Sequence, residues 1–171
     1  MAAVTASHRF GTVQPWATLV ARLALAAILA TAAWSKLVVP ANSVVSVKAY
    51  RLFPDSIATV IGYGQPALEL ALALLLLAGF ASRFVAIATA VLMVIFIAGI
   101  ISVWVRGLSI DCGCFGAGGN VADGPSQYPL DILRDLGFIV LAAWIAVFPR
   151  SRLSADAALA VDGGEPGDDV A

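Results

Sequence analysis

Residues 57–105 read IATVIGYGQPALELALALLLLAGF, ASR and FVAIATAVLMVIFIAGIISVWV, two long apolar runs joined by three residues. A helix rises about 1.5 Å per residue and the hydrocarbon layer of a bilayer is ~30 Å thick, so about 20 apolar residues make one crossing. Because lipid offers no hydrogen bonds, each run is expected to be helical. The short connector, Ala81-Ser82-Arg83, predicts that the two helices form an antiparallel hairpin.

Two further apolar segments flank this hairpin, at Trp16–Leu37 and Leu130–Phe148. With Ile57–Phe80 and Phe84–Val105, they predict an all-α membrane protein, an up-down bundle of four transmembrane helices. The composition agrees, because 61% of residues are hydrophobic and 12% are charged, against about 45–50% and about 25% in soluble domains. No basic run is present that could grip nucleic acid phosphates.

The chain divides into three predicted parts. Residues 1–15 form a polar cytoplasmic leader, residues 16–150 form the membrane domain, and residues 151–171 form an acidic cytoplasmic tail expected to be disordered. A cleaved signal peptide is the alternative for the first span. The length of that segment and the interruption by Arg22 favour a retained helix.

Four crossings would place both termini on one side of the membrane. The positive-inside rule does not select that side, because four basic residues lie with the termini and four lie toward the other face, when Lys36 at the end of the first span is counted with Lys48, Arg51 and Arg106. Arg150 and Arg152, beside the free acidic tail, favour termini in the cytoplasm of a bacterial inner (plasma) membrane. Two cysteines in the last connector agree with this orientation, since disulfide chemistry operates outside the cytoplasm.

Residues 38–56, between the first two spans, contain either a short interfacial helix or an irregular loop. In the helical interpretation, Asn42 caps the helix and Pro54 ends it. The side chains that would form the apolar face on the membrane are Val45, Ala49, Leu52 and Phe53.

Three ionisable residues lie within the predicted spans: Arg22, Lys36 and Glu69. Such residues usually face the interior of a bundle and pair with one another. Arg22 and Lys36 are fourteen positions apart, about 40° around a helix, so they share one face. From depth alone we expect an Arg22–Glu69 ion pair. It could be a structural lock between two spans, part of a quinone or proton site, or the result of unrelated burial.

The fourth span begins with Asp131, Arg134 and Asp135, whose i, i+3 and i, i+4 spacings put them on adjoining faces of the first turns. The simpler interpretation is a charge-balanced helix start. The alternative is that Arg134 reaches the cysteine loop and favours a thiolate.

The last connector carries the segment Asp111-Cys112-Gly113-Cys114-Phe115-Gly116, which contains both cysteines of the chain. Two thiols are too few for a zinc site, so no metal site is predicted within the chain. A disulfide between Cys112 and Cys114 requires a sharp bend, which Gly113 permits, and so small a ring should be strained and therefore oxidising. Redox-active thiols are the leading interpretation. A static pair and a metal site shared with a partner are the alternatives, and Asp111 opposes the thiolate by charge repulsion.

These residues together resemble the MauE/DoxX group of four-helix bacterial membrane proteins. The resemblance covers residues 16–150 and rests on Arg22, the segment Ala33-Trp34-Ser35-Lys36-Leu37, Glu69 with its Leu-rich run to Gly79, and residues 111–116, which look like the MauE branch. It implies an accessory membrane protein in extracytoplasmic thiol-disulfide traffic. MauE proteins are associated with methylamine utilisation and with maturation of a disulfide-rich dehydrogenase subunit.

Three functions are compatible with these features. The first is disulfide exchange through Cys112 and Cys114 with an extracytoplasmic thioredoxin-fold protein or with membrane oxidoreductase subunits. One cysteine pair cannot complete an electron relay alone, so a quinone bound in the bundle or a second protein would take the electrons. The second is a non-enzymatic scaffold or assembly subunit. The third is a small quinone-binding or transport protein built around Arg22, Lys36 and Glu69.

Overall fold

The computed structural model describes residues 2–113, 118–120 and 127–149. This part of the chain holds five helices and one short antiparallel ribbon of two strands. In chain order the elements are α1 (Ala2–Val38), α2 (Pro40–Ala49), α3 (Asp55–Ala78), α4 (Ser82–Val105), β1 (Ile110–Cys112), β2 (Gly118–Asn120) and α5 (Tyr128–Val147). Residues 2–15, predicted as a polar leader, continue α1 as helix. The tail at 151–171 lies outside the described residues.

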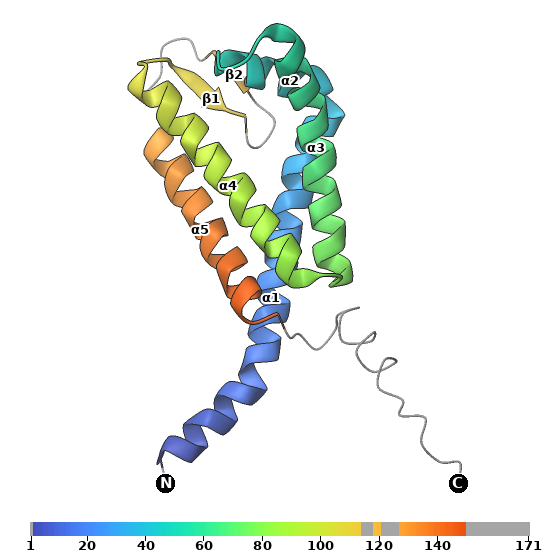
Figure 1. Ribbon diagram of the computed structural model, residues 1–171, viewed down its shortest axis with the longest axis vertical. Helices are drawn as coiled ribbons and strands as arrows, with labels where there is room; N and C mark the ends of the chain where they lie inside the picture. The colour runs from blue at the N-terminus through green and yellow to red at the C-terminus, as the bar shows by residue number, and fades with distance from the viewer. Residues whose placement is uncertain (1, 114–117, 121–126, 150–171) are drawn as a thin grey trace, which may run out of the picture.

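The four long helices lie side by side, and α2 and the ribbon lie together at one end of the bundle (Figure 1). α1 packs on α3 and α5, and α4 packs on α5. The Thr18 hydroxyl near the start of the packed part of α1 donates to the carbonyl of Phe148 at the end of α5, at 3.0 Å. These two helices therefore run in opposite directions. A core rich in Ala and Leu fills the space between the long helices.

Three helices are long and apolar enough to cross a bilayer, judged by length and composition: Val13–Val38, Asp55–Ala78 and Ser82–Val105. Large side chains on their outer faces are exposed, as in Phe84 (75%) and Val105 (83%), which suits a lipid solvent. α5 has 20 residues, but its three charged residues leave an uninterrupted apolar stretch only at 136–147. The first three predicted spans are thus confirmed at this level, and the fourth crossing stays a prediction.

The short helix predicted between the first two spans exists as α2, but the predicted cap is wrong. The helix begins at Pro40, with Val39 as its N-cap, and the Asn42 backbone N–H donates to the carbonyl of Val39 at 3.0 Å. Proline, with its fixed φ, favours the first helical position, so the helix starts three residues earlier than predicted. Pro54 is the N-cap of α3 and does not end α2.

The faces of α2 follow the rule for helices in lipid, where small side chains make the contacts between helices. Ser43 and Ser46 are buried, whereas Val45, Leu52 and Phe53 of the predicted apolar face are about half exposed. α2 packs on α3 through Gly62, where a Cβ atom would lie 2.6 Å from the Cα of Val44. The two backbones therefore meet at a distance that only glycine allows.

The connector between α3 and α4 turns sharply at Gly79, which has a φ of 66°. The N–H of Gly79 donates to the carbonyl of Leu76 and the N–H of Phe80 donates to that of Leu75, at 3.2 and 3.1 Å. This pair of bonds is a Schellman motif, and a left-handed glycine is its usual residue. The predicted antiparallel hairpin is thus closed by a standard helix cap.

Replacing Gly62 with alanine is expected to destabilise the end of the bundle that carries α2. The added methyl would overlap the backbone of Val44, which cannot move aside as a side chain would, so we expect a loss of about 1–3 kcal/mol. The measurement is the thermal unfolding midpoint in detergent. Gly64→Ala is the matched control, because its Cβ would have no atom within 4 Å. Equal midpoints for the two variants would contradict the close approach of α2 and α3.

Candidate functional site

Cys112 is the last residue of β1 in the β1–β2 ribbon. β1 pairs antiparallel with β2, and Cys112 is opposite Gly118. Gly113 follows at once, is buried, and has a φ of 68°, a left-handed conformation that favours glycine. Gly113 therefore uses the conformational freedom that the sequence predicts for it, and the bend between the cysteines stays a prediction. Cys114, Phe115 and Gly116 lie outside the described residues, and Asp111 and Cys112 are described by their backbone alone.

Tyr128, at the start of α5, holds the base of this ribbon. Its hydroxyl accepts a hydrogen bond from the N–H of Ile110 at 3.0 Å and donates to the carbonyl of Leu108. The side chain is only 3% exposed, and it packs in one cluster with Ile100 and Val103 of α4. The strand that leads to Cys112 is thus anchored to the ends of two helices.

Arg106, just after α4, joins the same end of the bundle to the connector after α2. Its guanidinium donates to the carbonyl of Ser102 at 3.0 Å and to the carbonyl of Tyr50. Lys48 of α2 pairs with Asp55 at the start of α3, at 3.4 Å and with both side chains well exposed. α2 is therefore tied to both α3 and α4 beside the cysteine loop.

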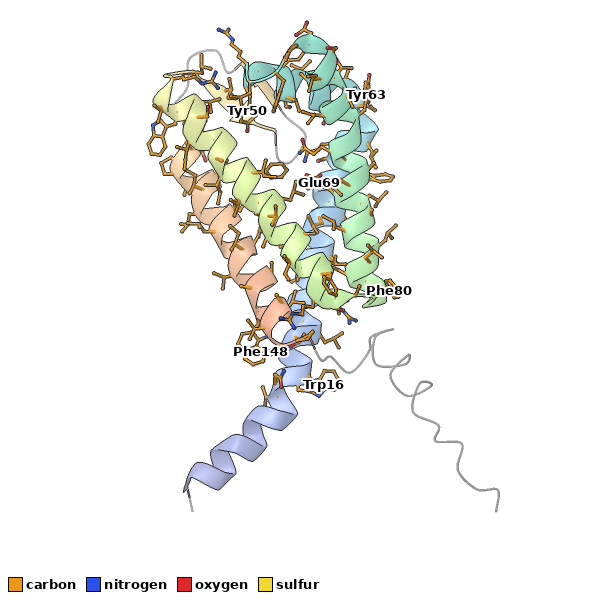
Figure 2. All side chains as sticks on the ribbon, in the orientation of Figure 1. Trp16, Tyr50, Tyr63, Glu69, Phe80 and Phe148 are labelled. Carbon is orange, nitrogen blue, oxygen red and sulfur yellow. The ribbon has the colours of Figure 1, made fainter. Side chains whose placement is uncertain are left out.

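A buried ion pair joins α1 to α3, and it is formed by Lys36. The Lys36 Nζ atom lies 2.6 Å and 2.9 Å from the two carboxylate oxygens of Glu69, and both side chains are 1% exposed. Gln65 donates its Nε2 hydrogen to Glu69 Oε1 at 3.2 Å, and Lys36 Nζ lies 5.7 Å from the ring centre of Phe96. Glu69 lies at mid-height of the bundle on α3 (Figure 2).

The predicted Arg22–Glu69 pair is wrong, because α2 shifts the register of α3. Lys36, near the end of α1, pairs with Glu69 in the middle of α3, so α3 begins well beyond the end of α1. Arg22 is fourteen residues before Lys36. The same antiparallel register places it near the level of residue 83, past the end of α3. Arg22 is buried at 2% exposure, as expected, but in a different layer of the bundle.

The charges at the start of α5 pair on their own helix. Arg134 lies 3.0 Å from Asp131 and 3.1 Å from Asp135, and Asp135 is 1% exposed. This agrees with a charge-balanced helix start. The alternative prediction, that Arg134 reaches a cysteine thiol, concerns cysteine side chains that lie outside the described residues.

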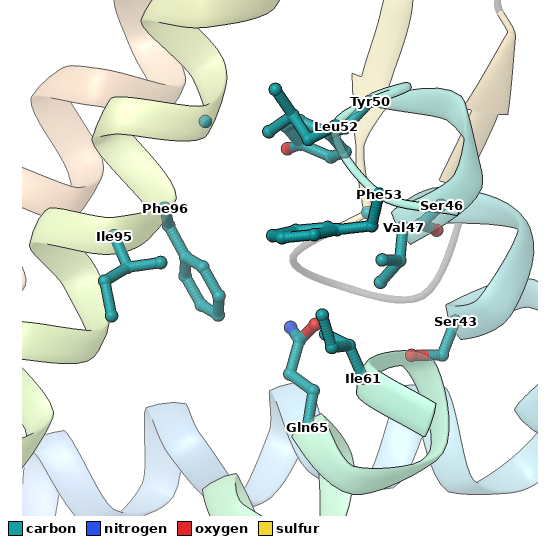
Figure 3. Close-up of a pocket in the computed structure, with 12 residues that line it drawn as sticks. Ser43, Ser46, Val47, Tyr50, Leu52, Phe53, Ile61, Gln65, Ile95 and Phe96 are labelled. Carbon is teal, nitrogen blue, oxygen red and sulfur yellow. The ribbon is translucent and has the colours of Figure 1, made fainter. Parts of the chain in front are cut away.

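A cavity of about 120 Å³ lies beside the cysteine loop, between α2, α3, α4 and the connector after α2 (Figure 3). Gly113 forms part of its wall, and so do Gln65 and Phe96, the two neighbours of the Lys36–Glu69 pair. The cavity therefore lies between the cysteine turn and the buried ion pair.

The sequence analysis did not identify Gln65, Phe96 or Tyr128. Gln65 is four residues before Glu69, so helical spacing would place both on one face. Phe96 and Tyr128 carry no comparable signal, because a single aromatic residue in an apolar helix is usually a packing residue.

The chain was compared with family models, with curated proteins and with solved structures. The model of the family described as "Methylamine utilisation protein MauE" matches residues 14–148. No curated protein and no solved structure matches. The matched residues include the ion pair, the cavity and the cysteine turn, together with the three apolar helices that mark a membrane protein. The chain therefore belongs to the MauE family.

Proposed function

We propose that this protein exchanges disulfides with a partner on the external face of the bacterial inner membrane, through Cys112 and Cys114. The observation that carries the proposal is the left-handed conformation of Gly113, the residue that separates the two cysteines and directly follows the paired strand β1. The strand is part of an anchored ribbon, through Tyr128. A rigid support of this kind favours one defined thiol geometry.

The proposed reaction is a two-step exchange. A thiolate of the partner attacks one sulfur of the Cys112–Cys114 disulfide, and the other cysteine leaves as a thiolate, which gives a mixed disulfide. A second partner thiolate then attacks the partner sulfur of that mixed disulfide. The products are a partner disulfide and two reduced cysteines, so two electrons pass to this chain. A small strained ring favours this direction, because it raises the reduction potential of the pair.

The proposed topology has four crossings, with α5 as the fourth. α5 packs along α4 and α1, which are themselves long apolar helices. Arg134 pairs with Asp131 and Asp135 on α5. This pairing lowers the free-energy cost of placing the three charged side chains of α5 near the membrane surface. Both termini then lie in the cytoplasm and the cysteine turn lies outside, where disulfides persist.

Membership of the MauE family links this activity to methylamine utilisation. We infer that the protein is an accessory factor that matures a disulfide-containing extracytoplasmic protein of such a pathway, directly or through a thioredoxin-fold carrier. The wider likeness to DoxX proteins suggests membrane oxidoreductase subunits as further partners.

Partner trapping tests the exchange reaction. The partner can form a mixed disulfide with either Cys112 or Cys114, and the other cysteine can then release it. In cells that produce the tagged protein, Cys112→Ser or Cys114→Ser removes one of these two releasing thiols. We therefore expect one single variant to accumulate a partner adduct that is sensitive to reductant. The double variant Cys112→Ser/Cys114→Ser is the control and should carry none. Recovery of the same partner with the double variant would contradict exchange through these thiols.

A non-enzymatic assembly subunit is the second candidate. A wide groove of about 530 Å³ runs between α1 and α5, lined by Ala17, Ala21 and Ala24 with Trp16 and Trp144. Small side chains allow close approach of another helix in lipid. A scaffold of this kind would function without either cysteine, which separates the two candidates.

A further inference from the structure

The cavity beside the cysteine turn has the size of one small ring. Its volume is about 120 Å³, and an apolar protein cavity of about 150 Å³ is known to take up benzene. Three aromatic residues line the space, and two of them, Phe53 from the connector after α2 and Phe96 from α4, face each other across it (Figure 3). A flat six-membered ring would therefore find aromatic partners on two sides.

The mouth of the cavity is formed by side chains on the outer, apolar surface. Ile95 is 59% exposed, Phe53 is 49% exposed and Leu52 is 47% exposed, and all three line the cavity. Ile95 lies in the middle of α4, the most apolar of the three candidate spans. A ligand would thus enter from the lipid, which selects for a molecule that partitions into the bilayer.

One polar side chain gives the cavity its chemical preference. Figure 3 shows the Gln65 amide pointing between the rings of Phe53 and Phe96. One of its two N–H groups is donated to Glu69, which is in turn held by Lys36. The amide is thereby oriented, and its second N–H can be donated to a carbonyl oxygen of an occupant. A ring that carries carbonyl groups fits this arrangement better than a plain hydrocarbon does.

The same cavity reaches the redox turn. Gly113 is part of its wall, and Cys112 and Cys114 are each one residue from Gly113. Consecutive Cα atoms are about 3.8 Å apart, so the backbone of both cysteines passes within one residue of the cavity. An electron acceptor in this space would contact the residue that lies between the two cysteines in the chain.

We propose that this cavity binds the ring of a lipid-soluble quinone and that the quinone accepts the electrons of Cys112 and Cys114. Two thiols lose two electrons and two protons and form one disulfide. The quinone gains both electrons and both protons and becomes the quinol. Gln65 donates a hydrogen bond to one quinone carbonyl and acts as a positioning residue. This role rests on the exchange function proposed above, but the binding site itself does not.

Binding is tested with the full chain carrying Cys112→Ser and Cys114→Ser, so that no thiol can react. The probe is an azido-quinone photolabel, displaced by decylubiquinone, in detergent or nanodiscs, with labelled peptides identified by mass spectrometry. We expect displaceable labelling near Phe53 or Phe96. Gln65→Leu should weaken the competition by decylubiquinone about tenfold, the size of one lost hydrogen bond. Gly99→Val should abolish the labelling, because its side chain would project beside Tyr50, which lines the cavity.

The control for both substitutions is Gly64→Ala, next to Gln65 in the chain but with open space around its Cβ. It should label like the parent, and thermal unfolding of each variant checks that the bundle is intact. Labelling that decylubiquinone does not displace, or that survives equally in folded Gln65→Leu and Gly99→Val proteins, would overturn the site.

Electron transfer is tested separately with the reduced wild-type chain. One equivalent of decylubiquinone, whose fully substituted ring does not add to thiols, should give one quinol and remove two free thiols. Partner trapping without quinone labelling would overturn this proposal and leave the exchange function intact. Displaceable labelling without thiol oxidation would overturn the acceptor role, and failed partner trapping would then separately reject the exchange function.

Discussion

Replacing Lys36 with methionine should lower the free energy of unfolding by about 3–5 kcal/mol. Lys36 Nζ contacts both oxygens of Glu69, at 2.6 and 2.9 Å, in a place where each side chain is 1% exposed. Methionine keeps most of the volume but removes the charge. Glu69 would be left as a buried carboxylate whose remaining contact is the hydrogen bond from Gln65. Glu69→Gln alone should be destabilising for the same reason, since the ammonium of Lys36 would be left without its carboxylate.

The double variant Lys36→Met/Glu69→Gln should recover most of the lost stability, because no buried charge is left without a partner. Lys48→Met is the matched control. It makes the same substitution in an ion pair whose two side chains are 38% and 87% exposed, where a loss of about 0–1 kcal/mol is expected. The measurement is thermal or denaturant unfolding in detergent. Equal losses for Lys36→Met and Lys48→Met would show that the buried pair does not lock α1 to α3.

Loss of either cysteine should reduce function to the level of a strain that lacks the protein. Serine matches cysteine closely in size but cannot form a disulfide, so Cys112→Ser and Cys114→Ser each remove one half of the redox couple. The measurement is complementation of a deletion strain, with protein level followed by immunoblot. Ser109→Ala, in the same connector, is the control and should complement fully.

The double variant Cys112→Ala/Cys114→Ala separates the two candidate functions. Disulfide exchange predicts no complementation at a normal protein level. Full complementation would reject exchange and favour the assembly subunit, in which the groove between α1 and α5 is the important surface.

The helices were predictable from the sequence because a bilayer imposes length and a closed backbone on each span. The observed ends of α3, α4 and α5 differ from the predicted ones by at most two residues, as at Asp55 for Ile57 and Tyr128 for Leu130, whereas α1 begins at Ala2, well before Trp16. The left-handed conformation of Gly113 was predictable for a similar reason, since a residue between two closely spaced cysteines has to allow a bend. Both are local properties of the chain.

The partner of Glu69 was not predictable in this way. The predicted Arg22–Glu69 pair compares the depths of the two residues, each counted from the end of its own span. This comparison assumes that the end of α1 and the start of α3 lie at the same level in the membrane. α3 instead begins well beyond the end of α1, where α2 packs on it at Gly62, so Lys36 and not Arg22 reaches Glu69. The cavity depends on the same non-local packing, because its walls come from segments that are distant in the chain. A pattern within one helix cannot reveal either feature.

The central claim is that Cys112 and Cys114 form a redox-active pair outside the cytoplasm. The most direct measurement is labelling of intact cells or spheroplasts with a membrane-impermeant maleimide, with and without prior reduction, with the modified thiols counted by mass shift. We predict two labelled thiols only after reduction, which places an oxidised pair on the external face. Labelling that requires permeabilised membranes would place the cysteine turn in the reducing cytoplasm and would contradict both the topology and the exchange function.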